Sequence, residues 1–176
     1  MHLGEAQRDM RQAYVNGGVG ILVSGLVWAV AGLVAYKAGL PAGMAALVFG
    51  GILIPPLSLL LARKFFRRGR TRSPNPMEML ALQATVFLII GLVIAYLVQE
   101  TYGDWFFAIA LLAVGGRYLV FQTVYGMRVF MVLGALLIAV AGIAILWPAF
   151  PPFAVALVAG AIEIICATLM LAPAKR

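Results

Sequence analysis

The sequence has few of the side chains on which most enzyme chemistry depends. It contains one cysteine, Cys166, and one histidine, His2, in 176 residues. A single thiol excludes an intramolecular disulfide and a multi-thiolate metal site. The single imidazole lies in the polar N-terminal segment, and this position excludes a His-ligated haem or zinc cluster. Acidic residues number only six, and no Ser-His-Asp, Cys-His, HExxH, DxD or P-loop arrangement is present. The sequence therefore predicts no metal site, no cofactor and, on balance, no enzymatic activity.

Charged residues of either sign are also scarce. They make up 11% of the chain, against about 25% in an ordinary soluble domain. Hydrophobic residues make up 64%, which is more than a soluble core needs. The apolar residues form continuous runs, whereas an outer-membrane barrel alternates apolar and polar positions. The composition predicts an all-α polytopic membrane protein.

Six apolar runs are long enough to cross a bilayer, because a helical span needs about 20 residues. Residues 1–12 before them are polar, and we expect a short cytoplasmic segment there. Within a single domain of residues 1–176 we predict spans over roughly 13–36, 41–62, 77–99, 105–126, 129–148 and 153–172.

Local signals mark where one span begins and how the spans are grouped. Asn75 is a good N-cap for the third span, with Pro76 at the first helical position and Glu78 completing a capping box. Glycines recur at equal spacing in the first and last pairs of spans, as Gly32 and Gly50 and then as Gly142 and Gly160. This repeat favours three helical hairpins in the same orientation.

The cations are concentrated on one side of the predicted membrane. Of thirteen lysines and arginines, twelve fall at the termini, in the second loop or around the fourth span, and only Lys37 falls on the other side. The positive-inside rule then places both termini in the cytoplasm. We expect the spans to lie in a bacterial inner membrane. The segment Arg63–Arg72 holds six of the cations and is suited to anionic lipid headgroups. This distribution argues against nucleic acid as the partner of the +7 net charge.

Two opposite charges, Arg117 and Glu163, lie inside apolar runs, where an isolated charge is costly. Each stands nine residues before the end of its span, about 13 Å from the inner boundary at 1.5 Å per residue. We therefore predict an Arg117–Glu163 ion pair facing the bundle interior, with hydrogen bonds from Gln83. The other expected members of this polar site are Tyr118, Gln122 and Tyr125.

Two functions are compatible with this polar layer. In the first, it lines a cytoplasm-facing cavity of a small transporter or channel-like protein, where Arg117 binds an anionic group and Glu163 exchanges a proton. Six short spans leave little room for a conduit, so this function favours a homo-oligomer. In the second, the pair only locks helices together in a structural or accessory membrane protein. Pro55 and Pro56 are either a packing kink or a hinge.

Several segments together carry a resemblance to a known family. They are SGLVWAVAG (24–32), FGGILIPPLSLL (49–60), NPMEMLALQATV (75–86), WFFAIALLAVGGRYLVFQTVYGMR (105–128) and GAIEI (160–164). Through them the chain resembles, over nearly its whole length, a family of small six-span bacterial membrane proteins of unknown function. The resemblance implies the six-span topology and no assigned activity.

Overall fold

The computed structural model describes residues 2–68, 71, 74–147 and 149–172. These residues form seven α-helices, two short 3-10 helices and no strand. Six of the helices are long and apolar enough to cross a membrane: α2 (Gly18–Ala38), α3 (Leu40–Phe66), α4 (Pro76–Gln99), α5 (Phe106–Tyr125), α6 (Arg128–Leu146) and α7 (Pro152–Leu171). The predicted all-α, six-span architecture is thus confirmed. Pro148, the predicted end of the fifth span, lies outside the described residues.

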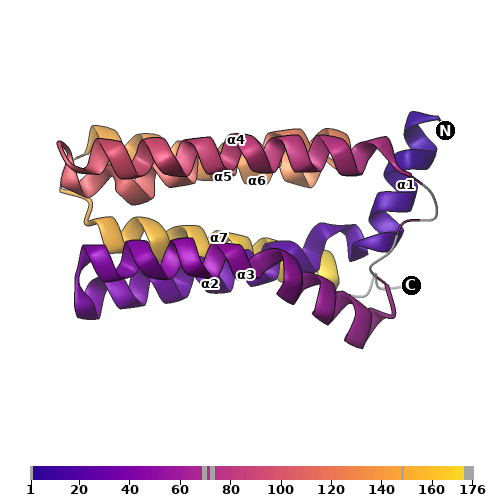
Figure 1. The fold of residues 1–176 in the computed structure, drawn as a ribbon, viewed down its shortest axis with the longest axis horizontal. Coiled ribbons are helices and arrows are strands. Elements are labelled where there is room, and N and C mark those ends of the chain that lie inside the picture. Colours follow the sequence, from indigo (N-terminus) through magenta and orange to yellow (C-terminus); the bar gives the residue numbers. More distant parts are fainter. Residues whose placement is uncertain (1, 69–70, 72–73, 148, 173–176) are drawn as a thin grey trace.

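The six spans are arranged as two halves of three helices each (Figure 1). In one half α2 lies between α3 and α7, and in the other α5 lies between α4 and α6. The predicted hairpins α2–α3 and α4–α5 each fall within one half. The two helices of the third predicted hairpin belong to different halves, because α6 packs mainly on α5 and α7 packs mainly on α2.

Close approaches between glycines explain why α6 and α7 separate. A Cβ built on Gly25 of α2 would lie 3.0 Å from the carbonyl oxygen of Gly160 of α7, and the reverse distance is 2.7 Å. Gly115 of α5 and Gly134 of α6 face each other with the same two distances, 3.0 and 2.7 Å. Small residues let helix backbones approach closely in lipid, where packing replaces the hydrophobic effect. Each half therefore contains one close glycine-to-glycine contact, which joins two of its three helices.

Both described ends of the chain lie at the same end of the bundle (Figure 1). The connections α3–α4 and α5–α6 are also there, with Arg63 and Lys64 in the last turn of α3 and Arg128 at the start of α6. We call this the basic end; the α2–α3, α4–α5 and α6–α7 connections lie at the opposite end. Four other cations predicted for this side, Arg70, Arg72, Lys175 and Arg176, lie outside the described residues.

The polar N-terminal segment forms a helix, α1 (Leu3–Ala13), which the sequence analysis did not predict. One face of α1 is buried against α4 and α5 across the basic end. Gln7 Nε2 donates to the carbonyl oxygen of Thr123 at 2.8 Å, and the Arg11 guanidinium donates to the carbonyl oxygen of Tyr125. These bonds satisfy carbonyl groups at the C-terminal end of α5, which has no intrahelical donors for them.

The start of α4 agrees with the prediction at Asn75 and corrects it at Glu78. The Asn75 side chain accepts a hydrogen bond from the Met77 amide at 3.0 Å, as expected of an N-cap. The Glu78 carboxylate instead accepts from the Tyr14 hydroxyl at 2.9 Å and the Thr71 hydroxyl at 3.1 Å. Burial, together with the Glu78 bond, raises the pKa of Tyr14 to about 12. Tyr14 is therefore a neutral donor at physiological pH, and Glu78 ties α4 to the chain between α1 and α2.

The helix α3 continues without a break through Pro55 and Pro56. Its C-terminal part turns away from the other helices (Figure 1). Proline removes backbone donors and is the usual cause of such bends. Both prolines are exposed, so the bend occurs at the surface of the bundle.

Candidate functional site: a cleft between the two halves

A cleft of about 890 Å³ lies between the two halves, within the usual size of a small-molecule site. Its walls come from α2 and α3 on one side and from α4 and α5 on the other. The helices α3 and α4 flank it without packing against one another. Phe49 of α3 and Ile89 of α4 line the cleft and are 68% and 55% exposed. The cleft therefore opens sideways between α3 and α4, on the side that would face lipid.

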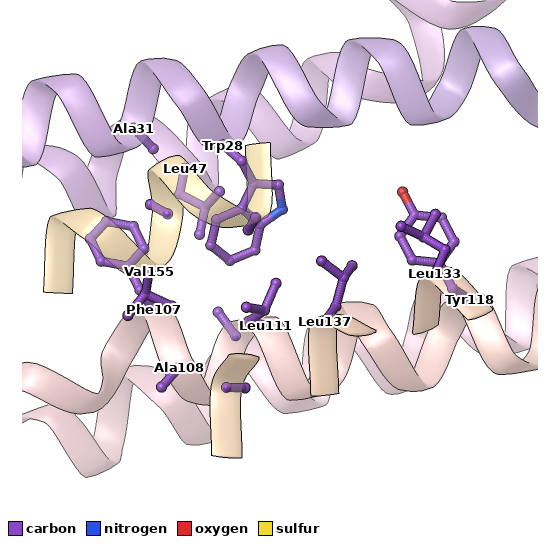
Figure 2. Close-up of a cluster of buried hydrophobic side chains, with 14 of the residues drawn as sticks. Trp28, Ala31, Leu47, Phe107, Ala108, Leu111, Tyr118, Leu133, Leu137 and Val155 are labelled. Atoms are coloured by element: carbon purple, nitrogen blue, oxygen red, sulfur yellow. The ribbon is translucent and has the colours of Figure 1, made fainter. Parts of the chain in front are cut away.

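A cluster of large side chains joins the halves behind this opening (Figure 2). Trp28 projects from α2 toward Phe107 and Leu111 of α5 and Leu137 of α6. The rings of Trp28 and Phe107 have their centroids 6.1 Å apart. Each of these four side chains is at least 98% buried, so they separate the cleft from the far side of the bundle. Trp28 also forms part of the cleft wall.

Polar groups meet in the cleft lining at the level of Tyr118. The Tyr118 hydroxyl points from α5 toward the half that contains α2 (Figure 2). It donates to Glu163 Oε1 of α7 at 2.8 Å, and the carboxyl group of Glu163 is fully buried behind it. The Ser24 hydroxyl of α2 lies beside both groups. Ser24, Tyr118 and Glu163 thus bring three helices together at one depth, and two of them, Ser24 and Tyr118, line the cleft.

Arg117 lines the cleft next to Tyr118, and its guanidinium lies over the ring of Phe121, 4.7 Å from the ring centroid. Its buried Nε has no hydrogen-bond partner among the described residues, and the same is true of Glu163 Oε2. The structure therefore corrects the predicted direct ion pair. Consecutive helical residues point about 100° apart at 3.6 residues per turn. Because Tyr118 faces Glu163, Arg117 points about 100° away from that direction and lines the cleft. Arg117 and Glu163 therefore interact only at longer range.

The remaining predicted site residues lie apart from this group. Gln83 is exposed on α4, whereas Thr85, two residues further on, faces the cleft. The predicted hydrogen bonds from Gln83 to the charged pair are therefore wrong. Tyr125 is buried and stacks on Phe130, with ring centroids 4.9 Å apart, and Gln122 is half-buried. Neither Tyr125 nor Gln122 belongs to the described lining of the cleft.

Ser24 and Trp28 are two of the lining residues that were not predicted from the sequence. They are four residues apart on α2, so they share one helix face. Ser24 is the one hydroxyl-bearing residue in the apolar run before Tyr36, which is a signal that the sequence carries. The predicted cavity also differs in character from the observed one. The observed cleft is mostly apolar and extends from the polar layer toward the end opposite the basic end.

The comparisons with known proteins bear on the family and not on the chemistry. Neither the curated proteins nor the solved structures contain a match to the chain. One family model matches residues 3–173, which is nearly the whole chain and includes all six membrane-spanning helices. The chain therefore belongs to DUF7010, a family of unknown function.

Proposed function

We propose that this protein is a small membrane transporter that binds an anionic group at Arg117 and exchanges a proton at Glu163. The observation that carries the proposal is the Arg117 side chain, which lines the cleft with a buried, unpartnered Nε. A charge at this depth is costly unless it is paired. A guanidinium presents a fork of donors that matches carboxylate and phosphate groups. An anionic ligand would therefore supply the partner that the fold itself does not place there.

Glu163 gives this site a means of coupling anion binding to a proton. Its carboxyl group is fully buried and is bonded to Tyr118, the direct neighbour of Arg117. A negative charge on Glu163 opposes an incoming anion at Arg117, and a proton on Glu163 removes that opposition. By linkage, anion binding then favours proton binding to the same extent. The proposal therefore predicts that anion and proton move together.

The second candidate is a structural or accessory membrane protein in which this layer only fixes the fold. The Tyr118–Glu163 hydrogen bond favours it, because that bond joins α5 of one half to α7 of the other. A buried polar contact of this kind can set which helices pair without taking part in chemistry. The two candidates differ in whether the layer responds to a solute.

The test is solute-driven proton movement in proteoliposomes that contain a pH-sensitive dye. A panel of organic anions is added under an inward proton gradient to wild type, Arg117→Met, Glu163→Gln and the matched control Gln83→Leu. We expect an anion-dependent acidification that falls by about tenfold or more in Arg117→Met, as for loss of one charge-assisted hydrogen bond. In Glu163→Gln the acidification should be lost, because glutamine cannot carry the proton. Gln83→Leu should match wild type, because Gln83 is exposed and away from the layer. Equal rates of acidification in wild type and Arg117→Met, or no response to any anion, would contradict the transport proposal and favour the structural role.

The proposal also concerns the membrane in which the protein lies and the molecules that it contacts there. The basic end suits the cytoplasmic side of a bacterial inner membrane by the positive-inside rule. Anionic lipid headgroups are the proposed partners of Arg63–Arg72. A homo-oligomer that leaves the opening between α3 and α4 free is also part of the proposal, and a mass measurement in nanodiscs would detect it.

A further inference from the structure

We infer that the ligand of this cleft is a single-chain amphiphilic anion, an alkyl chain with one carboxylate or phosphate head, that enters from the bilayer between α3 and α4. The inference rests on the proposed function and names its substrate class. Three features of the cleft carry it: its length, the chemistry of its polar end and the character of its rim.

The cleft has the length of an extended alkyl chain. Its wall on α3 runs from Pro41 to Pro55, and its wall on α4 runs from Thr85 to Gln99. Each stretch advances 14 residues (55 − 41 and 99 − 85), or about 21 Å at 1.5 Å per residue. Half the hydrocarbon core of a bilayer is about 15 Å thick. A lipid-length chain therefore fits along these walls.

The polar groups of the cleft lie together at one level, where they could bind a single anionic headgroup. Arg117 supplies the charge, and the hydroxyls of Ser24 and Tyr118 lie at the same level. A cationic head would meet a like charge here, and an uncharged head would leave the guanidinium unpaired. Beyond this level the walls are lined largely by apolar side chains, including Met44, Leu47, Leu88 and Leu92. The head would thus lie toward the basic end and the tail toward the opposite end.

The rim of the cleft favours entry from lipid. Ile52 of α3 and Val93 of α4 line it and are 66% and 53% exposed. Apolar side chains on both sides of the opening present no barrier to a hydrocarbon chain, and they offer no hydrogen bonds to a hydrated solute. A small polar anion such as acetate would gain only the head contacts, with Arg117 and the two hydroxyls, and none along the apolar walls.

Trp28 provides a direct test, because it lines the cleft four residues from Ser24, about 6 Å along α2. The other two tryptophans, Trp105 and Trp147, lie near the end opposite the basic end and are replaced by phenylalanine. The double variant is reconstituted in nanodiscs, and Trp28 fluorescence is followed as a dibrominated stearate is added. Brominated alkyl alcohol, alkylammonium and phosphatidylcholine are compared with it, and unlabelled alkyl phosphate, acetate and inorganic phosphate serve as competitors.

We expect saturable quenching by the brominated stearate and displacement by alkyl phosphate, with little effect of acetate or inorganic phosphate. Bromines placed near the carboxylate should quench more than bromines near the methyl end, because Trp28 is close to the proposed head site. Arg117→Met should weaken the apparent affinity by about tenfold or more, Arg117→Lys by less, and Gln83→Leu should have no effect. The headgroup comparison uses the arginine-containing protein, so it decides the matter even if Arg117→Met does not fold.

Three results would overturn the inference. Equal saturable quenching by the alcohol or the ammonium compound would show that charge does not select the ligand. Quenching by phosphatidylcholine alone would show that bulk lipid fills the cleft. No saturable quenching together with a dimer in the nanodisc would show that a second copy covers it. Binding of the stearate without anion-driven proton movement would instead contradict only the transport proposal, and movement of small anions without stearate binding would contradict only this inference.

Discussion

At the scale of single residues, two neighbours in sequence have different surroundings. Arg117 and Tyr118 are consecutive on α5, yet one contacts the Phe121 ring and the cleft while the other bonds a carboxylate on α7. The difference follows from helix geometry, since a buried donor on α5 can face α7 only if its neighbour faces elsewhere. Tyr118, and not Arg117, is thus the residue of α5 that bonds Glu163.

Removal of the Tyr118 hydroxyl should destabilise the protein. In Tyr118→Phe the fully buried Glu163 would lose the hydrogen bond to its Oε1, at a cost of about 1 kcal/mol. A lower midpoint of thermal unfolding in nanodiscs is the expected result. The matched control is Tyr96→Phe, because Tyr96 is 56% exposed and should tolerate the change. Equal unfolding midpoints for the two variants would show that the Tyr118–Glu163 bond contributes nothing to stability.

The sequence identified some of these residues and misplaced another. Arg117 and Glu163 were predictable as site residues because a charge inside an apolar run is costly and is usually paired or functional. Gln83 was placed in the same layer from its depth alone, and the structure shows it exposed on α4. The run from Pro76 to Gln99 is apolar on all sides, so the sequence contains no stripe that says which face is buried. The depth of a residue in the membrane can be predicted from the sequence of such a helix, but the direction in which its side chain points cannot.

At the scale of helices, glycines decide which spans are neighbours. The α2–α7 and α5–α6 contacts each place two glycines opposite one another, where a side chain would meet backbone. The loop between α6 and α7 is short, but proximity in sequence supplies no packing energy. Close backbone approach does supply it in lipid. This is why the glycine repeat indicated the importance of Gly160 without revealing its partner.

A single methyl group at this contact should therefore be damaging. In Gly160→Ala the new Cβ would meet the Gly25 carbonyl oxygen at 2.7 Å and the Ala29 amide nitrogen at 2.8 Å. These are backbone atoms that cannot turn aside, so we expect a loss of about 1–3 kcal/mol. Gly142→Ala is the matched control, since nothing lies within 4 Å of its Cβ position. Thermal unfolding of both variants in one lipid measures the effect, and an unchanged midpoint for Gly160→Ala would contradict the close contact.

At the scale of the whole molecule, the two halves meet through a core on one side and leave a cleft on the other. The helix α1 covers the basic end and bonds to carbonyl groups at the end of α5. The Asn75 amide donates to the Ala6 carbonyl oxygen at 3.0 Å, so α1 also bonds the residue that caps α4. The N-terminal segment thus lies across the α4–α5 part of the basic end, and the cleft opens to the side. The cleft that contains Arg117 and Tyr118 differs from the expected polar cavity, because it is mostly apolar and extends away from the basic end.

The orientation of the whole bundle is open to a direct test. Gly4 and Gly103 are exposed glycines at the basic and the opposite end, and nothing lies within 4 Å of a Cβ on either. Each is changed to cysteine in a Cys166→Ala background, and intact cells are treated with a membrane-impermeant maleimide. Gly103→Cys should react in intact cells and Gly4→Cys only after permeabilisation, because cations stay on the cytoplasmic side. The reverse pattern would overturn the predicted topology.

The class of the molecule, the number of its spans and the two charges inside them could be predicted from the sequence alone. These properties depend on composition and on the cost of placing a charge in hydrocarbon, and both can be read residue by residue. The packing of the helices was needed to show that α7 joins α2, that Glu163 bonds Tyr118 and not Arg117, and that the cleft is mostly apolar and opens between α3 and α4. Those outcomes depend on which faces of nearly uniform apolar helices meet, and backbone contacts between distant glycines set those faces.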